Sequence, residues 1–206
     1  MASDRPIVVK LGGSFAYSDH LQHWIDALAA GAGRIVIVPG GGPFADAVRL
    51  AQRKMRFDDK AAHHMAVLAM EQYGRALASF NSAFSLAGSA GAIERDLGEK
   101  RVPVWMPSAM VLAATDIAQS WSVTSDSLAA WLAAKIGAGR LWIVKHTKLS
   151  PGSAKLQDLV AARIVDDEFA RFLQRLPLRV SILGPSDHNT TVVAIRDGTS
   201  VGIGIQ

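Results

Sequence analysis

Runs of apolar residues without polar alternation recur along the chain and predict buried β-strands. The clearest are residues 7–11 (Ile-Val-Val-Lys-Leu) and 35–38 (Ile-Val-Ile-Val). A strand covered on both faces has this pattern, because neither set of alternating side chains meets water. Further strands are predicted at residues 102–106, 141–145 and 178–183.

Between these runs, apolar residues recur at helical spacing. Helices are predicted at residues 19–30, 43–55, from 58 or 59 to 80, 128–136 and 166–176. On the second of them, Phe44, Ala47, Val48 and Ala51 are expected to face the core. Residues 82–98, rich in Ser, Ala and Gly, predict an irregular connection or a short helix, and residues 150–157 predict a loop.

The order of these elements predicts an α/β fold. Strands that alternate with helices favour a mainly parallel central sheet with helices on both faces, a three-layer αβα sandwich. Residues 192–195 and 201–205, with an Asp197-Gly198 turn between them, predict a C-terminal antiparallel hairpin. With no internal repeat and no linker, residues 1–206 are expected to form a single domain.

Charge and composition narrow the classes of partner. The formal net charge is +4, but the basic residues are scattered, and the densest cluster is Arg49, Arg53, Lys54 and Arg56. A solvated helix face or a rim for anionic substrates is favoured over a nucleic-acid surface. With no cysteine, no apolar run of membrane-spanning length and no hydrophobic leader, we expect a cytoplasmic protein with neither a nucleic-acid nor a membrane partner.

Three consecutive glycines follow the run at residues 35–38. Gly40, Gly41 and Gly42 can take backbone angles closed to other residues, and Pro43 suits the first position of a helix. The free N–H groups of such a turn and helix start favour an anion, most often a phosphate. The alternative is a tight strand-to-helix connection without a ligand.

A similar unit stands earlier in the chain, where Lys10 is followed by Gly12, Gly13 and Ser14. An ammonium group within a buried strand is costly unless an anion meets it. The alternative is that Lys10 reaches solvent at a sheet edge. Two glycine turns, one with a lysine, indicate a site that holds two phosphate-bearing groups.

Other familiar sites are not supported by the sequence. Neither a P-loop nor a dinucleotide-binding glycine motif occurs, and a nucleophile elbow at residues 12–16 lacks its last glycine. His63 and His64 are adjacent and point to different helix faces, and His20 and His23 have no evident third ligand. No metal-binding residues are therefore predicted, whereas a substrate contact from His63 or His64 stays open.

Four segments, in this order, resemble the amino acid kinase superfamily, which includes uridylate, acetylglutamate, aspartate and isopentenyl phosphate kinases. They are Val-Lys-Leu-Gly-Gly-Ser at 9–14, the glycines at 40–42, Thr-Ser-Asp-Ser-Leu-Ala-Ala at 124–130 and Lys-His-Thr-Lys at 145–148. The last is similar to a segment of bacterial uridylate kinases. The resemblance covers nearly the whole chain and implies the amino acid kinase fold and usually a homo-oligomer.

The resemblance also implies roles for these residues. Lys10 and Asp126 would be catalytic, with Asp126 orienting the lysines; the alternative is that Asp126 is an ordinary helix N-cap. The phosphates of ATP would be held by Lys10, Gly12, Gly13 and Ser14, and the nucleotide site would be bordered by Lys145, Thr147 and Lys148. The acceptor or the transferring phosphoryl group would be held by Gly40, Gly41, Gly42, Thr124 and Ser125. Mg²⁺ would sit mostly on phosphate oxygens.

This chain departs from its relatives in two respects. Many of them carry a second catalytic lysine on a late glycine-rich loop, for which Lys145, Lys148 and Lys155 are candidates here. The Thr-Asp-x-x-Gly nucleotide segment is missing. The chain is also short for this family, so a reduced lid or acceptor domain is expected.

The same resemblance bears on the acceptor. The segments at 124–127 and 145–148 favour a phosphate monoester over a carboxylate, and the pattern at 121–132 is similar to that of family members acting on aminomethyl-furanyl-methyl phosphate. That reaction gives the diphosphate in methanofuran-type one-carbon cofactor biosynthesis. The alternatives are UMP, isopentenyl phosphate or a carboxylate as acceptor, or a non-catalytic member that binds a nucleotide or oxyanion. A flat furan ring could be flanked by Trp121, Trp131, Phe44 or Trp105, although each also suits a core.

Overall fold

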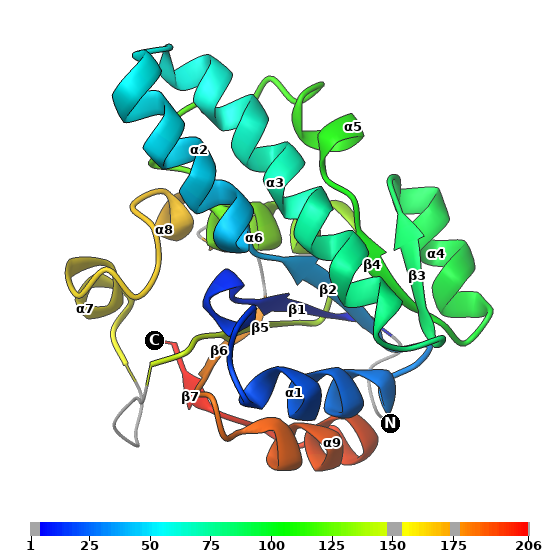
Figure 1. The fold of residues 1–206 in the computed structure, drawn as a ribbon. Coiled ribbons are helices and arrows are strands. Elements are labelled where there is room, and N and C mark those ends of the chain that lie inside the picture. Colours follow the sequence, from blue (N-terminus) through cyan, green and yellow to red (C-terminus); the bar gives the residue numbers. More distant parts are fainter. Residues whose placement is uncertain (1–4, 148–153, 174–177, 206) are drawn as a thin grey trace.

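The structure, a computed structural model, describes residues 5–147, 154–173 and 178–205 (Figure 1). The strands are β1 (Ile7–Leu11), β2 (Ile35–Pro39), β3 (Phe84–Ala87), β4 (Val102–Trp105), β5 (Arg140–Val144), β6 (Arg179–Leu183) and β7 (Ile203–Gly204). The helices are η1 (Gly13–Phe15), α1 (His20–Ala29), α2 (Gly42–Met55), α3 (Asp59–Ser79), α4 (Ala90–Gly98), α5 (Ser108–Val111), α6 (Ser125–Lys135), α7 (Leu156–Ala161), α8 (Phe169–Leu173) and α9 (His188–Asp197).

The strands form one sheet in the order β3-β4-β2-β1-β5-β6-β7. Neighbours are parallel except β6 and β7, which are antiparallel. The predicted α/β class, the mainly parallel sheet and the antiparallel pairing near the C-terminus are therefore confirmed. Leu11 at the end of β1 pairs with Pro39 of β2 and Val144 of β5, so the segments that follow these three strands emerge at one edge of the sheet.

Helices cover both faces of the sheet (Figure 1). Helices α1 and α9 lie side by side and pack with Val9 and Leu11 of β1 in one apolar cluster. Helices α6 and α8 pack with Val8 in the other cluster, and α3 crosses β2, β3 and β4 with residues in both. Two layers of helix therefore enclose the strands, as their unbroken apolar pattern requires. No described helix has the length and apolar character needed to cross a bilayer.

The prediction for residues 82–98 was incomplete. This segment contains the edge strand β3, which pairs with β4, before helix α4. Strand β3 is only four residues long, too short for a clear periodic signal. The Ser89 hydroxyl accepts a hydrogen bond from Ala92 N at 3.1 Å, so it caps the start of α4.

The predicted strand at residues 192–195 is wrong. These residues belong to α9, and the antiparallel partner of β7 is β6. Ala194 and Ile195 are buried whereas Val192 and Val193 are exposed, which is a helical rather than an alternating pattern. Gly198, with φ of +73°, ends this helix in the left-handed conformation instead of forming a two-residue hairpin turn.

Two other local predictions also need correction. Helix α2 buries Ala45 and Val48, whereas Phe44 and Ala47 are exposed. The acidic residues at 166–168 precede α8 instead of occupying its first turn, and residues 174–176 of the predicted helix lie outside the described residues.

Candidate active site

Lys10, Asp126 and Lys145 meet near the carboxyl ends of β1 and β5. Lys10 lies within β1, Lys145 follows β5 directly, and Asp126 is in the first turn of α6. The Lys10 Nζ atom is 2.9 Å from Asp126 Oδ1, and the Lys145 Nζ atom is 2.5 Å from Asp126 Oδ2. The Lys10 and Asp126 side chains are only 6% and 4% exposed. One carboxylate thus holds two ammonium groups in a nearly dry site, and one positive charge is left over.

Burial shifts the protonation of this group of three. It lowers the pKa of Lys10 to about 8, against the opposing effect of the Asp126 carboxylate, and the nearby Lys145 lowers the pKa further. Burial by itself would raise the pKa of Asp126, but the two lysines outweigh it and hold that pKa below its usual value. Asp126 is therefore an anion that positions lysines, and its engagement with both of them makes it unsuited to act as a base.

Helix α6 is held in place by Asp166, a residue that the sequence reading assigned to the following helix. The Asp166 carboxylate accepts hydrogen bonds from Thr124 N (2.9 Å), Thr124 Oγ1 (2.6 Å), Ser127 N (3.1 Å) and Ser127 Oγ. Thr124 is the N-cap of α6, so the alternative interpretation of Asp126 as an ordinary N-cap is wrong. An anion at this helix start is favourable and fixes the turn that carries Asp126.

The two glycine turns touch each other beside the lysines. A Cβ atom on Gly13 would lie 2.1 Å from Gly42 N, and one on Gly40 would lie 2.4 Å from Gly13 N. Gly42 also has a φ of +54°. Any side chain at Gly13 or Gly40 would separate the turns, so both positions require glycine. Because Gly42 opens α2, its N–H is one of those that the helix itself leaves unused.

A cavity of about 290 Å³ opens at this junction. The sequence-predicted residues that line it are Lys10, Gly13, Ser14, Gly41, Gly42, Thr124, Ser125, Asp126 and Lys145. Gly12 and Gly40 stand behind it, where their N–H groups donate to Val144 O and Leu11 O. Thr147 is exposed and does not line the cavity, and Lys148 lies outside the described residues.

Of the aromatic residues considered for a flat substrate ring, one lines the cavity. The Trp121 indole N–H donates to Gln52 Oε1 at 2.7 Å, and the Arg49 guanidinium lies 4.4 Å from the centre of the Trp121 ring. Trp105 and Trp131 are buried in the core, where their ring centres are 6.3 Å apart. Phe44 is partly exposed and is not part of the lining.

Two further lining residues carry chemistry that the sequence left unassigned. His63 is 3% exposed, and its Nε2 atom has no hydrogen-bond partner among the described residues. Burial lowers the pKa of His63, although a hydrogen bond to the backbone of Ser120 opposes this, so Nε2 is suited to meet a ligand in its neutral form. Asp46, paired with Arg49 at 3.1 Å, is the other carboxylate in the lining besides Asp126.

The residues present fit a polyphosphate. Two lysines, glycines that admit a ligand against the backbone and the start of α2 all face one cavity, and this combination suits several phosphate groups. Among the described residues, no group of three or more His, Cys, Asp or Glu side chains could hold a metal ion.

Comparisons with known proteins show the family of the chain. The sequence model of the amino acid kinase family matches residues 5–148. A curated relative, the [5-(aminomethyl)furan-3-yl]methyl phosphate kinase of Methanocaldococcus jannaschii, is 26% identical, and the alignment covers 93% of each chain.

Solved structures of uridylate (UMP) kinases have the same fold. The enzyme from Archaeoglobus fulgidus superposes with a TM-score of 0.73 at 17% identity, covering 98% of this chain and 100% of the other. The enzyme from Bacillus anthracis gives 0.71 at 15% identity, with 98% and 96% coverage. At these identities the likeness concerns the fold alone.

Proposed function

This chain belongs to the amino acid kinase family, and from that premise we propose that it transfers the γ-phosphoryl group of ATP to a phosphate monoester. The observation that carries this proposal is the Asp126 carboxylate, held between Lys10 and Lys145 where two glycine turns meet. Phosphoryl transfer depends mainly on positioning and on neutralising charge, and this arrangement supplies both.

The lysines act on the charge that moves during the reaction. The bond between the γ-phosphorus and the β,γ-bridging oxygen breaks, and ADP leaves with the electron pair. A new bond joins the same phosphorus to an oxygen of the acceptor phosphate. Lys10 and Lys145, both held by Asp126, would neutralise negative charge on the transferring group. Backbone N–H groups at Gly13 and Gly42 position the phosphates on either side.

A phosphate acceptor suits this set of residues. A phosphate monoester has its second pKa near 6, about as for phosphorylated side chains, so at neutral pH its oxygen attacks without losing a proton. An alcohol would need a general base. Asp126 is unsuited to that role because both of its oxygens are already paired with lysines.

For the acceptor itself, we propose an aminomethyl-furanyl-methyl phosphate, converted to its diphosphate in methanofuran-type cofactor biosynthesis. The relative from M. jannaschii is, by its name, a kinase for such a compound. In this chain, the Trp121 ring offers a flat surface for the furan, and Asp46 offers a carboxylate for the ammonium group. His63, which α3 contributes to the cavity lining, would accept a hydrogen bond from the acceptor at its Nε2 atom.

Magnesium is proposed to enter with ATP. Bound to the phosphate oxygens, it supplies charge neutralisation during transfer. The buried carboxylate of the cavity, Asp126, is already engaged by Lys10 and Lys145, and Asp46 is proposed to hold the ammonium group of the acceptor. The protein would thus recognise Mg-ATP through its phosphates.

An acceptor panel tests this proposal. ADP release from Mg-ATP would be measured with aminomethyl-furanyl-methyl phosphate, UMP, isopentenyl phosphate and acetylglutamate as separate acceptors. The proposal predicts the highest kcat/KM for the furan phosphate. A preference for UMP would assign the chain to a different phosphate kinase, and ATP binding without turnover would favour a non-catalytic member.

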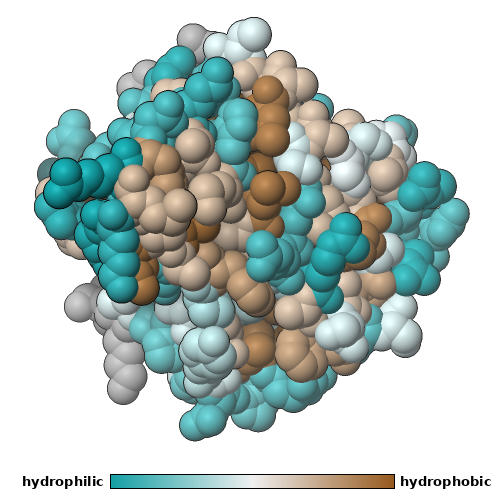
Figure 2. Space-filling view, turned by 45° about the horizontal axis from the view of Figure 1, so that its top comes forward, coloured by the Kyte–Doolittle hydropathy of each residue, from teal (hydrophilic) through white to brown (hydrophobic). Residues whose placement is uncertain are grey.

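We also propose that two copies of the chain associate through α2 and α3. Figure 2 shows hydrophobic residues spread across the face turned toward the viewer, where these helices lie. Leu50 is 47% exposed, and Met65 and Leu68 follow at 40% and 46% on α3. Light scattering would test this: Leu68→Glu is expected to halve the mass, whereas Leu86→Glu, at an exposed position on β3, is expected to leave it unchanged.

A further inference from the structure

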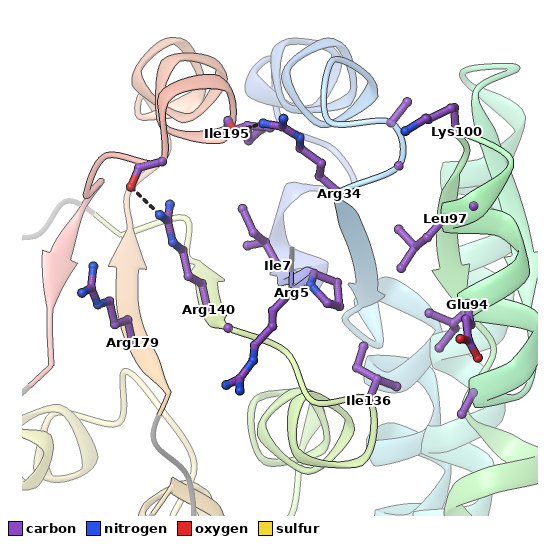
Figure 3. Close-up of a pocket in the computed structure, with 18 of the residues that line it drawn as sticks. Arg5, Ile7, Arg34, Glu94, Leu97, Lys100, Ile136, Arg140, Arg179 and Ile195 are labelled. Carbon is purple, nitrogen blue, oxygen red and sulfur yellow. Dashed lines mark hydrogen bonds between the residues drawn. The ribbon is translucent and has the colours of Figure 1, made fainter. Parts of the chain in front are cut away.

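A second cavity lies at the opposite end of the sheet from the candidate active site. Its volume is about 1260 Å³. It borders the amino ends of the strands, with Ile7 of β1, Arg140 of β5 and Arg179 of β6 in its lining (Figure 3). Lys10 and Lys145 lie toward the carboxyl ends of β1 and β5. The two cavities therefore share strands but no lining residue.

The second cavity is strongly basic. Its cationic lining residues are Arg5, Arg34, Lys100, Lys135, Arg140 and Arg179. The acidic lining residues are Glu94 and Asp197, and Asp197 already pairs with Arg196 at 2.7 Å. Within the part of the chain that the structure describes, no ion pair involves Arg34, Lys100, Lys135, Arg140 or Arg179. The cavity thus carries an excess of positive charge.

The topology brings the arginines together. Arg140 and Arg179 are register partners on the neighbouring parallel strands β5 and β6, and Arg34 directly precedes β2. Like charges at paired positions of a sheet repel each other. Burial lowers the pKa of Arg140, and Arg179 lowers it further, although a guanidinium remains charged. A bound anion would relieve this repulsion.

Two of these arginines are held in fixed positions by the end of α9. Arg34 Nη1 donates to Ile195 O at 2.9 Å, and Arg140 donates to Thr199 O at 3.1 Å and to Gly198 O (Figure 3). The carbonyl groups at a helix end supply only a partial negative charge. They orient the guanidinium groups without neutralising them.

The cavity also has an apolar side. Figure 3 shows Arg5, Arg140 and Arg179 on one side, and across from them the apolar Leu97 and Ile136 together with Glu94 and Lys100. Ligand sites commonly combine an apolar wall with a few convergent charged groups. Cations that converge on a hollow fit a compact anion better than the extended backbone of a nucleic acid, which prefers a stripe of charge.

We propose that this second cavity binds a small organic polyphosphate, with its phosphates on the arginines and Lys100 and its apolar or aromatic part against Leu97 and Ile136. This site is separate from the one that carries the proposed phosphoryl transfer. Binding is expected to weaken as salt is added, because exposed charges make most of the contacts.

Calorimetric titration with inorganic triphosphate tests the charge recognition. Wild-type protein is expected to bind at both cavities. The double variant Arg179→Gln/Lys100→Gln is expected to lose the second site or weaken it by about tenfold or more, since a hydrogen bond to a charged group contributes about 1.5–3 kcal/mol. Lys10→Met, which alters the active site, is expected to retain triphosphate binding at the second cavity. The control Arg75→Gln/Lys60→Gln removes the same charges from α3, outside both cavities.

Two outcomes would overturn the proposal: a single site in the wild type that is lost in Lys10→Met, or two sites that persist in Arg179→Gln/Lys100→Gln. A titration of Lys10→Met with ATP then tests the apolar side. Tighter binding of ATP than of inorganic triphosphate supports an organic ligand, and equal or weaker binding of ATP contradicts it. Kinase activity is expected to be unchanged in Arg179→Gln/Lys100→Gln. Failure of the second site and failure of the proposed function can therefore be told apart.

Discussion

The ammonium group of Lys10 lies 2.9 Å from the carboxylate of Asp126, and both side chains are almost fully buried. Asp126 binds Lys145 through its other oxygen, at 2.5 Å. Burial of an ion pair is expensive and is seldom justified by stability alone. The additional positive charge beside two glycine turns suits the proposed role of this arrangement, which is to bind phosphate.

Removing the Lys10 charge is predicted to abolish most phosphoryl transfer. Lys10→Met keeps the side-chain volume, and we expect kcat to fall by about 10²–10³-fold, as for other lost groups that stabilise transition-state charge. Lys60→Met, at an exposed position in the first turn of α3, should retain full activity. Equal kcat values for Lys10→Met and wild type, with both proteins folded by circular dichroism, would exclude a role for Lys10.

The pH profile should report the lowered pKa of Lys10. Because that pKa is about 8 and not 10.5, the free enzyme loses the Lys10 charge at much lower pH than an ordinary lysine would. We predict that kcat/KM for Mg-ATP declines as pH rises through about 8. In Lys10→Arg the guanidinium stays charged, so any remaining activity should lack this decline. A wild-type profile that is flat up to pH 10 would contradict the prediction.

The contact between the glycine turns predicts a large effect from one methyl group. In Gly13→Ala the new Cβ would lie 2.1 Å from Gly42 N, so the turns must separate. We expect a loss of about 1–3 kcal/mol in the free energy of unfolding, as for other overpacked sites, together with weaker ATP binding. Gly91→Ala is the matched control, because its Cβ would meet nothing within 4 Å and it lies inside α4. Similar stabilities for the two variants would argue against a tight contact.

The Asp46 carboxylate is predicted to recognise the ammonium group of the acceptor. In Asp46→Asn, kcat/KM for the aminomethyl-furan phosphate should fall about tenfold, the usual cost of losing a charged hydrogen bond. The same ratio for a furan-methyl phosphate without the amine should change little. An equal loss for both acceptors would mean that Asp46 acts by positioning Arg49 and does not recognise the amine.

Residues at the ends of strong strands could be located from the sequence alone. A clear apolar run ends at or just before Lys10, each glycine turn and Lys145. Because these runs are parallel neighbours in the sheet, the residues that follow them meet at one edge. Of the three candidates for the second lysine, Lys145 contacts Asp126, Lys155 is exposed at the start of α7, and Lys148 lies outside the described residues. That Lys145 takes this role stays a prediction.

Contacts between distant segments could not be found in this way. The bonds from Asp166 to Thr124 and Ser127 span about forty positions and have no local signature. His63 has an ordinary place on a helix, and His64 Nε2 is likewise buried without a partner among the described residues. Only its position in the cavity lining distinguishes His63. In α9, the β-branched Val192 and Val193 suggested a strand, although tertiary packing of Ala194 and Ile195 favours the helix. That residues 1–206 form one domain stays a prediction.

The most direct test of the central claim is ³¹P NMR of the reaction of Mg-ATP with aminomethyl-furanyl-methyl phosphate. We predict two coupled diphosphate resonances that grow in step with ADP in wild type and grow about 10²–10³-fold more slowly in Lys10→Met. Such a product requires a new bond from the γ-phosphorus to an acceptor phosphate oxygen. Inorganic phosphate as the only new signal besides those of ADP, or phosphorus bonded to the amine nitrogen, would contradict the proposed transfer between phosphates.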